Sequence, residues 1–282
     1  MQAYPLFEFG GAGPALHLAV ANGFPPHTYG PLLLPLTDTY RILSLPPRPL
    51  WPGIGEPPAR TGSWRELADD LLAGLRQHDL TDVIAVGHSF GGVASLLAVL
   101  AEPGRFRGLI LLDPTILPPL AMDAIRALRE HNGGARLPLV EGALNRRSRF
   151  ASHDEAFAYW RGKALFSDWP DAALRLYTES MTRPAAGGGL ELTWSPAWEA
   201  YYYQSVYIDS WDDLPHLDGL LPTLVIGGET TTTFTADARE TARALLPRAA
   251  HATIAGHGHL FPHSAPGETE RVIRGWLRAS GL

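Results

Sequence analysis

The sequence alternates short apolar runs with amphipathic segments, and this alternation limits the possible fold more than any other feature. The runs are apolar at nearly every position, which is typical of parallel strands covered by helices on both faces. A strand, helix, strand order of this kind predicts an α/β fold with a mostly parallel sheet and helices on both of its faces. The predicted strands are LHLAVANGF (16–24), YRILSL (40–45), DVIAVG (82–87), GLILLD (108–113), TLVIGG (223–228) and HATIAG (251–256).

The amphipathic segments between the strands predict helices, and the clearest of them covers residues 63–77. It begins with Ser63, and Glu66 follows three positions later, which is the capping-box pattern of a helix N-terminus. Its apolar residues recur on one helical face, as expected of a helix packed on a sheet. Further helices are predicted at 91–101, 237–246 and 268–277.

Residues 116–220 interrupt the alternation, because they contain helical patterns but no buried strand pattern. A loop of this length without secondary structure of its own is uncommon in a compact domain. The interval also holds five of the eight Trp and six of the nine Tyr, so it contains enough apolar side chains to pack as a layer. We therefore predict a mainly helical cap at 116–220, inserted into a core formed by residues 1–115 and 221–282.

A serine stands between two glycines at the point where the strand 82–87 meets the apolar helix 91–101. Gly87-His88-Ser89-Phe90-Gly91 has the Gly-x-Ser-x-Gly pattern of a nucleophile elbow, a tight turn that exposes its serine at the carboxyl end of a sheet. The N-terminus of the following helix favours negative charge at the same place. Ser89 is therefore our candidate nucleophile, and a turn without chemistry is the alternative.

A serine hydroxyl needs a base within hydrogen-bond reach, and the last predicted strand is followed by three histidines. His259 lies directly after that strand in a Gly-x-Gly-His turn and is the favoured base. His257 and His263 are expected to be surface residues. The spacing of His257 and His259 also fits a pair of metal ligands, but no acidic ligand accompanies them, so we expect no metal.

The acid that orients the base has two candidates, and the residues alone leave both open. Asp113 ends a buried strand next to the one that carries Ser89, where an acid is costly unless it is used or paired. Glu229 follows the strand 223–228 in a loop that continues with four threonines. The acid has to fix the imidazole tautomer and stabilise the imidazolium.

Two backbone N–H groups are needed to hold the oxyanion of a tetrahedral intermediate. The residue after the nucleophile, Phe90, is predicted to supply one of them. The other is assigned to Phe24 in the NGFPP segment (22–26), which follows an early strand. A plain turn forced by Gly23 and Pro25 is the alternative for that segment.

Together these segments resemble the α/β-hydrolase fold superfamily, specifically its cap-bearing, esterase-like members. GHSFGG is similar to the elbow of that family, NGFPP to its His-Gly-Phe-Pro oxyanion loop, GHGHLF to its terminal histidine turn and LILLDP to the strand after its elbow. The order of these motifs along the chain is also the order in that family.

The sequence departs from the family pattern in the oxyanion loop and at the acid. Asn22 replaces the usual histidine of the oxyanion loop. The acid expected after the penultimate strand is missing, and Thr231 stands about where it would fall. Some family members carry the acid after the strand that follows the elbow, and the resemblance therefore favours Asp113.

The resulting prediction is a serine hydrolase that cleaves a carboxylic ester, or a similarly activated acyl compound, through an acyl-enzyme. A small apolar ester is the expected substrate, because aromatic residues gather in the predicted cap. Hydrolysis of a carbon–carbon bond or acyl transfer with the same triad is the first alternative. A non-catalytic protein that binds a small ligand is the second.

Composition excludes several other classes of protein. The net charge of −6 disfavours nucleic acid and anionic membranes as partners. The absence of cysteine excludes disulfides, thiolate zinc sites and a cysteine nucleophile. No apolar run is long enough to span a membrane and no signal peptide is visible, so a cytoplasmic location is expected. No cofactor is expected, and the oligomeric state stays open.

Overall fold

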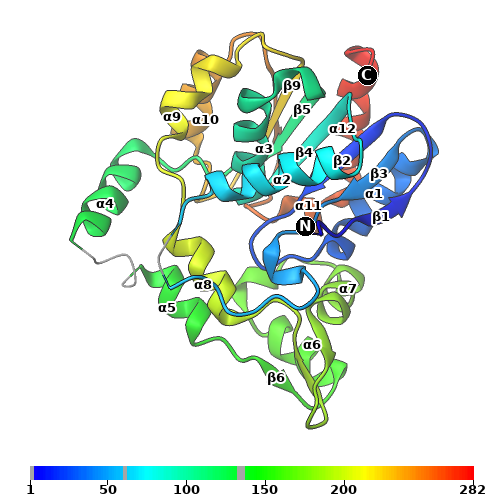
Figure 1. Ribbon diagram of the computed structural model, residues 1–282, viewed down its shortest axis with the longest axis vertical. Helices are drawn as coiled ribbons and strands as arrows, with labels where there is room; N and C mark the ends of the chain where they lie inside the picture. The colour runs from blue at the N-terminus through cyan, green and yellow to red at the C-terminus, as the bar shows by residue number, and fades with distance from the viewer. Residues whose placement is uncertain (1–2, 60–61, 132–136) are drawn as a thin grey trace.

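The computed structural model describes residues 3–59, 62–131 and 137–282, which form an α/β sheet domain with a long insert (Figure 1). The central sheet has seven strands in the order β1-β3-β2-β4-β5-β9-β10. All neighbouring strands are parallel except β1, which pairs with β3 in the antiparallel sense. The strands are β1 (Phe7–Gly10), β2 (Ala15–Ala19), β3 (Arg41–Ser44), β4 (Val83–His88), β5 (Phe106–Leu112), β9 (Thr223–Gly228) and β10 (Ala250–Ile254).

All six predicted strands are present, and most of them end within a few residues of the expected positions. The largest difference is β2, which ends at Ala19, where 24 was expected. The chain there enters the turn around Gly23, which has a φ of 82°, a backbone conformation that glycine adopts at little cost. The edge strand β1 was not predicted, because its FEFG sequence is short and only partly buried.

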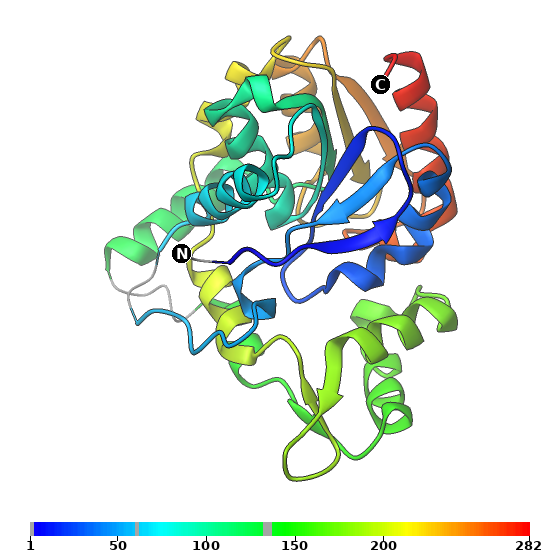
Figure 2. The same cartoon turned by 45° about the vertical axis from the view of Figure 1, so that its right-hand side comes forward.

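Helices cover both faces of the sheet, as predicted. Gly87 of β4 faces α3 (Phe90–Ala101), since a side chain there would collide with Gly91 and Gly92. Gly108 of β5 pairs with Ile84, three residues before Gly87, and therefore points to the opposite face. A side chain at Gly108 would meet Trp276 of α12 (Pro266–Ala279). The helices α3 and α12 therefore lie on opposite faces of the sheet (Figures 1 and 2).

The other two predicted helices of the sheet domain, at 63–77 and 237–246, are present within two residues of their expected ends, whereas the short helices at 30–33 and 261–264 were not predicted. Helix α2 (Arg65–Gln77) packs on α3, and α12 packs on α1 (Gly30–Leu33) and on the short helix α11 (Phe261–Ser264). Helix α10 (Ala236–Leu245) follows β9. The predicted capping box of α2 is not formed: the Ser63 hydroxyl accepts from the Arg65 N–H at 3.4 Å and not from Glu66, and the Glu66 carboxylate accepts hydrogen bonds from Arg48 and Tyr201 instead.

Between β5 and β9 the chain leaves the sheet and forms the insert, whose middle part lies below the sheet in Figure 2. The insert also contains a small antiparallel sheet in the order β6-β8-β7, which the helical prediction missed. Its strands have only two or three residues each, too few to show a pattern. A role of residues 116–220 as a separate cap domain stays a prediction. The insert consists of α4 (Pro119–Glu130), α5 (Pro138–Leu144), β6 (Arg149–Phe150), α6 (His153–Arg161), α7 (Asp171–Met181), β7 (Thr182–Pro184), β8 (Leu190–Leu192), α8 (Pro196–Gln204) and α9 (Ser210–Asp213).

None of the helices within the described residues is long and apolar enough to cross a membrane. A cytoplasmic location stays a prediction.

Candidate active site

Ser89 occupies a strained turn between β4 and α3. Its φ of 59° and ψ of −122° lie outside the regions that a serine normally adopts, so the surrounding fold holds it there. Two glycines make room for the turn. A side chain at Gly87 would come within 2.4 Å of the Gly91 carbonyl oxygen, and one at Gly91 within 2.4 Å of the Ala19 carbonyl oxygen. This is the geometry expected of a nucleophile elbow.

The structure brings Ser89, His259 and Asp113 together from three separate segments. Ser89 Oγ lies 2.9 Å from His259 Nε2, and His259 Nδ1 lies 2.6 Å from Asp113 Oδ2. Because a carboxylate only accepts hydrogen bonds, Nδ1 carries the imidazole proton and Nε2 is free to accept the proton of Ser89. This is the arrangement that nucleophilic catalysis by a serine requires.

Asp113 is completely buried, and each of its carboxylate oxygens has a donor. The Gly228 N–H donates to Oδ1 at 2.9 Å, and the Thr231 hydroxyl donates to Oδ2 at 2.7 Å, beside the bond from His259. Thr231 therefore occupies the position at which the family usually has its acid. There it donates a hydrogen bond to Asp113, which follows the neighbouring strand β5.

Glu229, the other candidate acid, lies elsewhere. Its side chain is exposed and accepts a hydrogen bond from the Gly256 N–H at 2.7 Å. No hydrogen bond joins it to His259 among the described residues. Of the two candidates, only Asp113 contacts the imidazole.

The two other histidines of the terminal segment differ from each other. His257 is partly exposed, and its Nδ1 lies 2.8 Å from Ser264 Oγ. His263 was expected at the surface, but the short helix α11 turns it inward, where it is buried and stacks on Trp169 with ring centroids 4.6 Å apart. Burial lowers the pKa of His263 to about 3, so it is neutral.

A hydrogen-bonded chain through Tyr29 and His88 was not predicted from the sequence. The Ala21 N–H donates to the Tyr29 hydroxyl at 2.9 Å, and that hydroxyl lies 2.7 Å from His88 Nδ1. His88 Nε2 lies 2.9 Å from the His259 carbonyl oxygen and must donate to it. Burial holds the pKa of His88 well below its usual value, which leaves Nδ1 free to accept from Tyr29. This series of hydrogen bonds connects the three segments that carry the candidate oxyanion loop, the elbow and the candidate base.

The two predicted oxyanion donors have different surroundings. Phe90 is the first residue of α3, so its N–H has no acceptor within the helix. The Phe24 N–H donates to the Ala21 carbonyl oxygen at 3.1 Å, closing the turn that contains Gly23. The Phe90 N–H is therefore available to an oxyanion. The Phe24 N–H would have to divide its hydrogen bond between an oxyanion and the Ala21 carbonyl oxygen.

Ser89 and His259 line a cavity of about 430 Å³. Its walls are mainly apolar and come from the candidate oxyanion loop, the elbow and the insert. None of the described residues that line it is Lys or Arg. Among the six aromatic residues at 194–207 that suggested an aromatic pocket, only Tyr203 lines the cavity, and the other rings pack inside the protein. The apolar side chains of the insert that line it are Leu117, Ile125, Leu137, Pro138, Leu139, Leu165 and Val206.

A second cavity of about 400 Å³ is more polar than the first. The two cavities share Asn22, Phe24, Leu165 and Tyr203. Arg146 and Glu199 form an ion pair in the wall of the second cavity. Glu199 also contacts the candidate oxyanion loop, because its carbonyl oxygen accepts a hydrogen bond from the Asn22 side-chain amide at 3.0 Å. Asn22, which replaces the family's usual histidine, therefore connects this loop to α8.

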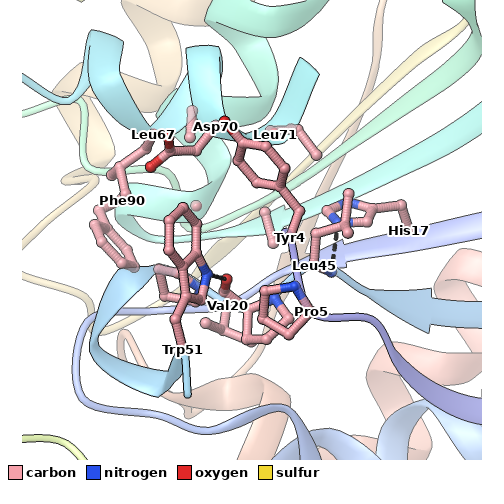
Figure 3. Close-up of a pocket in the computed structure, with 15 residues that line it drawn as sticks. Tyr4, Pro5, His17, Val20, Leu45, Trp51, Leu67, Asp70, Leu71 and Phe90 are labelled. Carbon is pink, nitrogen blue, oxygen red and sulfur yellow. Dashed lines mark hydrogen bonds between the residues drawn. The ribbon is translucent and has the colours of Figure 1, made fainter. Parts of the chain in front are cut away.

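A third cavity, shown in Figure 3, lies behind the elbow, where Phe90 and Gly91 form part of its wall. Its volume is about 40 Å³, too small for a substrate. Tyr4 and Trp51 line it and make an edge-to-face contact with each other, and the Trp51 indole N–H donates to the Pro46 carbonyl oxygen at 2.7 Å. Among the described residues no cluster of three or more His, Asp or Glu could hold a metal ion.

Comparison with known proteins agrees with this architecture. The family model described as "Alpha/beta hydrolase family" matches residues 16–272. The chain belongs to this family. The predicted superfamily and its fold are thereby confirmed, and the chain is a hydrolase by family.

Several known hydrolases are similar to this chain. A 2-(acetamidomethylene)succinate hydrolase from Mesorhizobium japonicum is 24% identical over 89% of this chain and 83% of its own length. A crystal structure of an E-2-(acetamidomethylene)succinate hydrolase superposes with a TM-score of 0.79, at 23% identity over 97% of this chain and 94% of that one. The N-formylmaleamic acid deformylase of Pseudomonas putida S16 has a TM-score of 0.62, 19% identity and coverages of 92% and 91%. A thermophilic esterase from Thermogutta terrifontis has a TM-score of 0.67, 20% identity and coverages of 99% and 94%.

Proposed function

We propose that this hydrolase acts through an acyl-enzyme on Ser89, with His259 as general base and Asp113 as the acid that orients it. The observation that carries the proposal is the continuous hydrogen-bonded line from Ser89 Oγ through the imidazole to the buried carboxylate, at 2.9 Å and 2.6 Å. Ser89 and His259 line a cavity that is large enough for a small substrate.

In the first half of the proposed reaction, Ser89 Oγ attacks the substrate carbonyl carbon while its proton passes to His259 Nε2. Asp113 stabilises the imidazolium that forms, and the N–H groups of Phe90 and Phe24 hold the oxyanion. The imidazolium then gives its proton to the leaving group as the carbonyl re-forms. In the second half, His259 takes a proton from water, the resulting hydroxide attacks the acyl carbon, and the proton returns to Ser89 Oγ.

For the bond that is cleaved, the relatives favour the alternative over the predicted ester. The succinate hydrolase and the deformylase have names that point to a carbon–carbon or amide-like bond. We therefore propose that the substrate is an activated acyl compound in which the cleaved bond joins the acyl carbon to a carbon or to an amide-like nitrogen of the leaving group. The esterase among the structural neighbours is less than 25% identical and supports only the fold.

The lining of the cavity further restricts the proposed substrate. The relatives' names describe a succinate and a maleamic acid, both of which carry carboxylates. A buried carboxylate needs a cationic or multiply donating partner, and no Lys or Arg is found among the described residues that line the cavity. The part of the substrate that lies next to Ser89 is therefore proposed to be uncharged and largely apolar.

The proposal is tested with three compounds that carry the same butyryl group: an ethyl ester, a β-diketone and an N-acyl enamine. We expect kcat/KM to be highest for the diketone or the enamine, and Ser89→Ala to lower turnover of each by on the order of 10⁶. A preference of tenfold or more for the ester would restore the ester prediction. Turnover that survives in the Ser89→Ala variant would refute the acyl-enzyme on Ser89.

A further inference from the structure

The hydroxyl of Thr115 contacts the candidate nucleophile. Thr115 Oγ1 lies 3.0 Å from Ser89 Oγ, and both residues line the main cavity. No motif in the sequence pointed to this threonine. We propose that Thr115 is a further catalytic residue, which donates a hydrogen bond to Ser89 Oγ and assists its departure from the acyl-enzyme. This inference rests on the proposed function of Ser89.

The proton on each oxygen can be assigned from the neighbouring bonds. His259 Nδ1 donates to the Asp113 carboxylate, so Nε2 carries no proton and must accept from Ser89. That bond uses the only proton of the Ser89 hydroxyl. In the contact between the two hydroxyls, Thr115 is therefore the donor and Ser89 Oγ the acceptor.

The backbone holds Thr115 in this position. Asp113 has a φ of 40°, which turns the chain sharply at the end of β5 and sends it back over the elbow. The Thr115 N–H then donates to the Ser89 carbonyl oxygen at 3.2 Å. Gly92 allows this close approach, since a side chain there would lie 3.2 Å from Pro114. One short turn thus brings the carboxylate to His259 and the hydroxyl to Ser89.

The hydrogen bond from Thr115 to Ser89 Oγ has different effects in the two halves of the proposed reaction. In the free enzyme the bond from Thr115 orients a neutral hydroxyl, whose proton points to His259. In the acyl-enzyme Ser89 Oγ is the leaving atom: the bond from Oγ to the acyl carbon breaks, and Oγ gains negative charge until the imidazolium protonates it. A donor beside an atom that gains charge stabilises the transition state more than the ground state. Thr115 should therefore assist deacylation more than acylation.

The test compares Thr115→Val, which keeps the shape of the side chain but removes the hydroxyl, with Thr115→Ser, which keeps the hydroxyl. Each variant and the wild type are mixed with p-nitrophenyl acetate, and the burst of p-nitrophenol is followed to the steady state. A lost hydrogen bond to a charged atom predicts a steady-state rate of deacylation about 10- to 100-fold lower for Thr115→Val. The burst rate should change less, and the acetyl-enzyme seen by intact mass spectrometry should accumulate. Thr115→Ser should stay within about threefold of the wild type, on the expectation that its hydroxyl makes the same hydrogen bond.

Three outcomes would overturn the inference, and they can be told apart. Equal steady-state rates for wild type and Thr115→Val would make the hydroxyl a spectator. Equal losses in Thr115→Val and Thr115→Ser would assign the effect to packing of the turn. If the wild type forms no acetyl-enzyme on Ser89, the proposed function itself fails, and the role of Thr115 fails with it.

Discussion

Replacing Asp113 by asparagine changes one oxygen into an NH₂ group and removes one negative charge from the buried site. The structure allows two orientations of the new amide. If the NH₂ replaces Oδ1, it faces the Gly228 N–H across a distance of 2.9 Å, and two buried donors oppose each other. If it replaces Oδ2, it faces His259 Nδ1 at 2.6 Å and the Thr231 hydroxyl at 2.7 Å.

The second orientation is favoured, because every buried group can then find a partner. The Thr231 hydroxyl can rotate, and His259 can accept at Nδ1 if its proton moves to Nε2. Opposing buried donors cost about 1–3 kcal/mol, so only about one molecule in 10 to 100 would keep the tautomer that can accept the Ser89 proton. The lost attraction between the Asp113 carboxylate and the imidazolium supplies a further factor on the order of 10². The expected total is a fall in kcat/KM of about 10³ to 10⁴.

The assay is the steady-state hydrolysis of p-nitrophenyl acetate by Asp113→Asn, with Glu229→Gln as the matched control. Both changes remove one carboxylate charge, but the Glu229 side chain is exposed and bonds only to the Gly256 N–H among the described residues. We expect Glu229→Gln to stay within about threefold of the wild type. A loss below tenfold for Asp113→Asn, or a larger loss for Glu229→Gln, would refute this assignment of the acid.

The other predictions concern the pH dependence of stability, the hydrogen bonds of Tyr29 to Ala21 and His88 (called the Tyr29 bridge below) and the charge of the substrate. Burial lowers the pKa of His17 and His263 to about 3 and that of His88 well below its usual value, so below about pH 6.5 the unfolded chain binds more protons than the folded one. The free energy of unfolding should therefore fall as the pH drops below about 6.5, by about 1.4 kcal/mol per histidine per pH unit; urea titrations at several pH values check this, and a pH-independent midpoint between pH 7 and 5 would contradict it. Tyr29→Phe leaves the Ala21 N–H without its buried acceptor, so we expect a loss of about 1–3 kcal/mol in unfolding free energy together with roughly tenfold lower turnover; unchanged turnover would show that the bridge does not position the site. A butyryl compound should be hydrolysed at least tenfold faster than its succinyl counterpart, since burying an unpaired carboxylate is costly. The reverse order in kcat/KM would show that the carboxylate reaches a cation, such as Arg146 or Lys163 of the second cavity.

Features of the fold that depend on local patterns could be predicted from the sequence. Strands buried on both faces have to be apolar at nearly every position, which makes them visible as runs. The elbow was also visible, because only glycine fits at positions 87 and 91, where any side chain would collide with the backbone. Asp113 could be proposed because an acid at the end of a buried strand is costly without a partner, and in the structure each of its oxygens has one.

Features that depend on contacts between distant segments could not be predicted. Tyr29 and His88 are 59 residues apart, and neither belongs to a pattern that predicts their hydrogen bond. The hydroxyl of Thr115 reaches Ser89 only because the chain reverses at Asp113, whose positive φ has no sequence signature here. The capping-box pattern at Ser63 failed for a similar reason, since Arg48 and Tyr201 bind the carboxylate that the cap would have used.

The most direct test of the central claim is whether the hydroxyl of Ser89 is the reactive group. The wild type is treated with a fluorophosphonate, digested and mapped by mass spectrometry, beside the Ser89→Ala and His259→Ala variants. We predict one labelled peptide, containing Ser89, with no label in Ser89→Ala and labelling at least 10²-fold slower in His259→Ala, which lacks the base. A label on another residue, or undiminished labelling of the Ser89→Ala variant, would contradict the account.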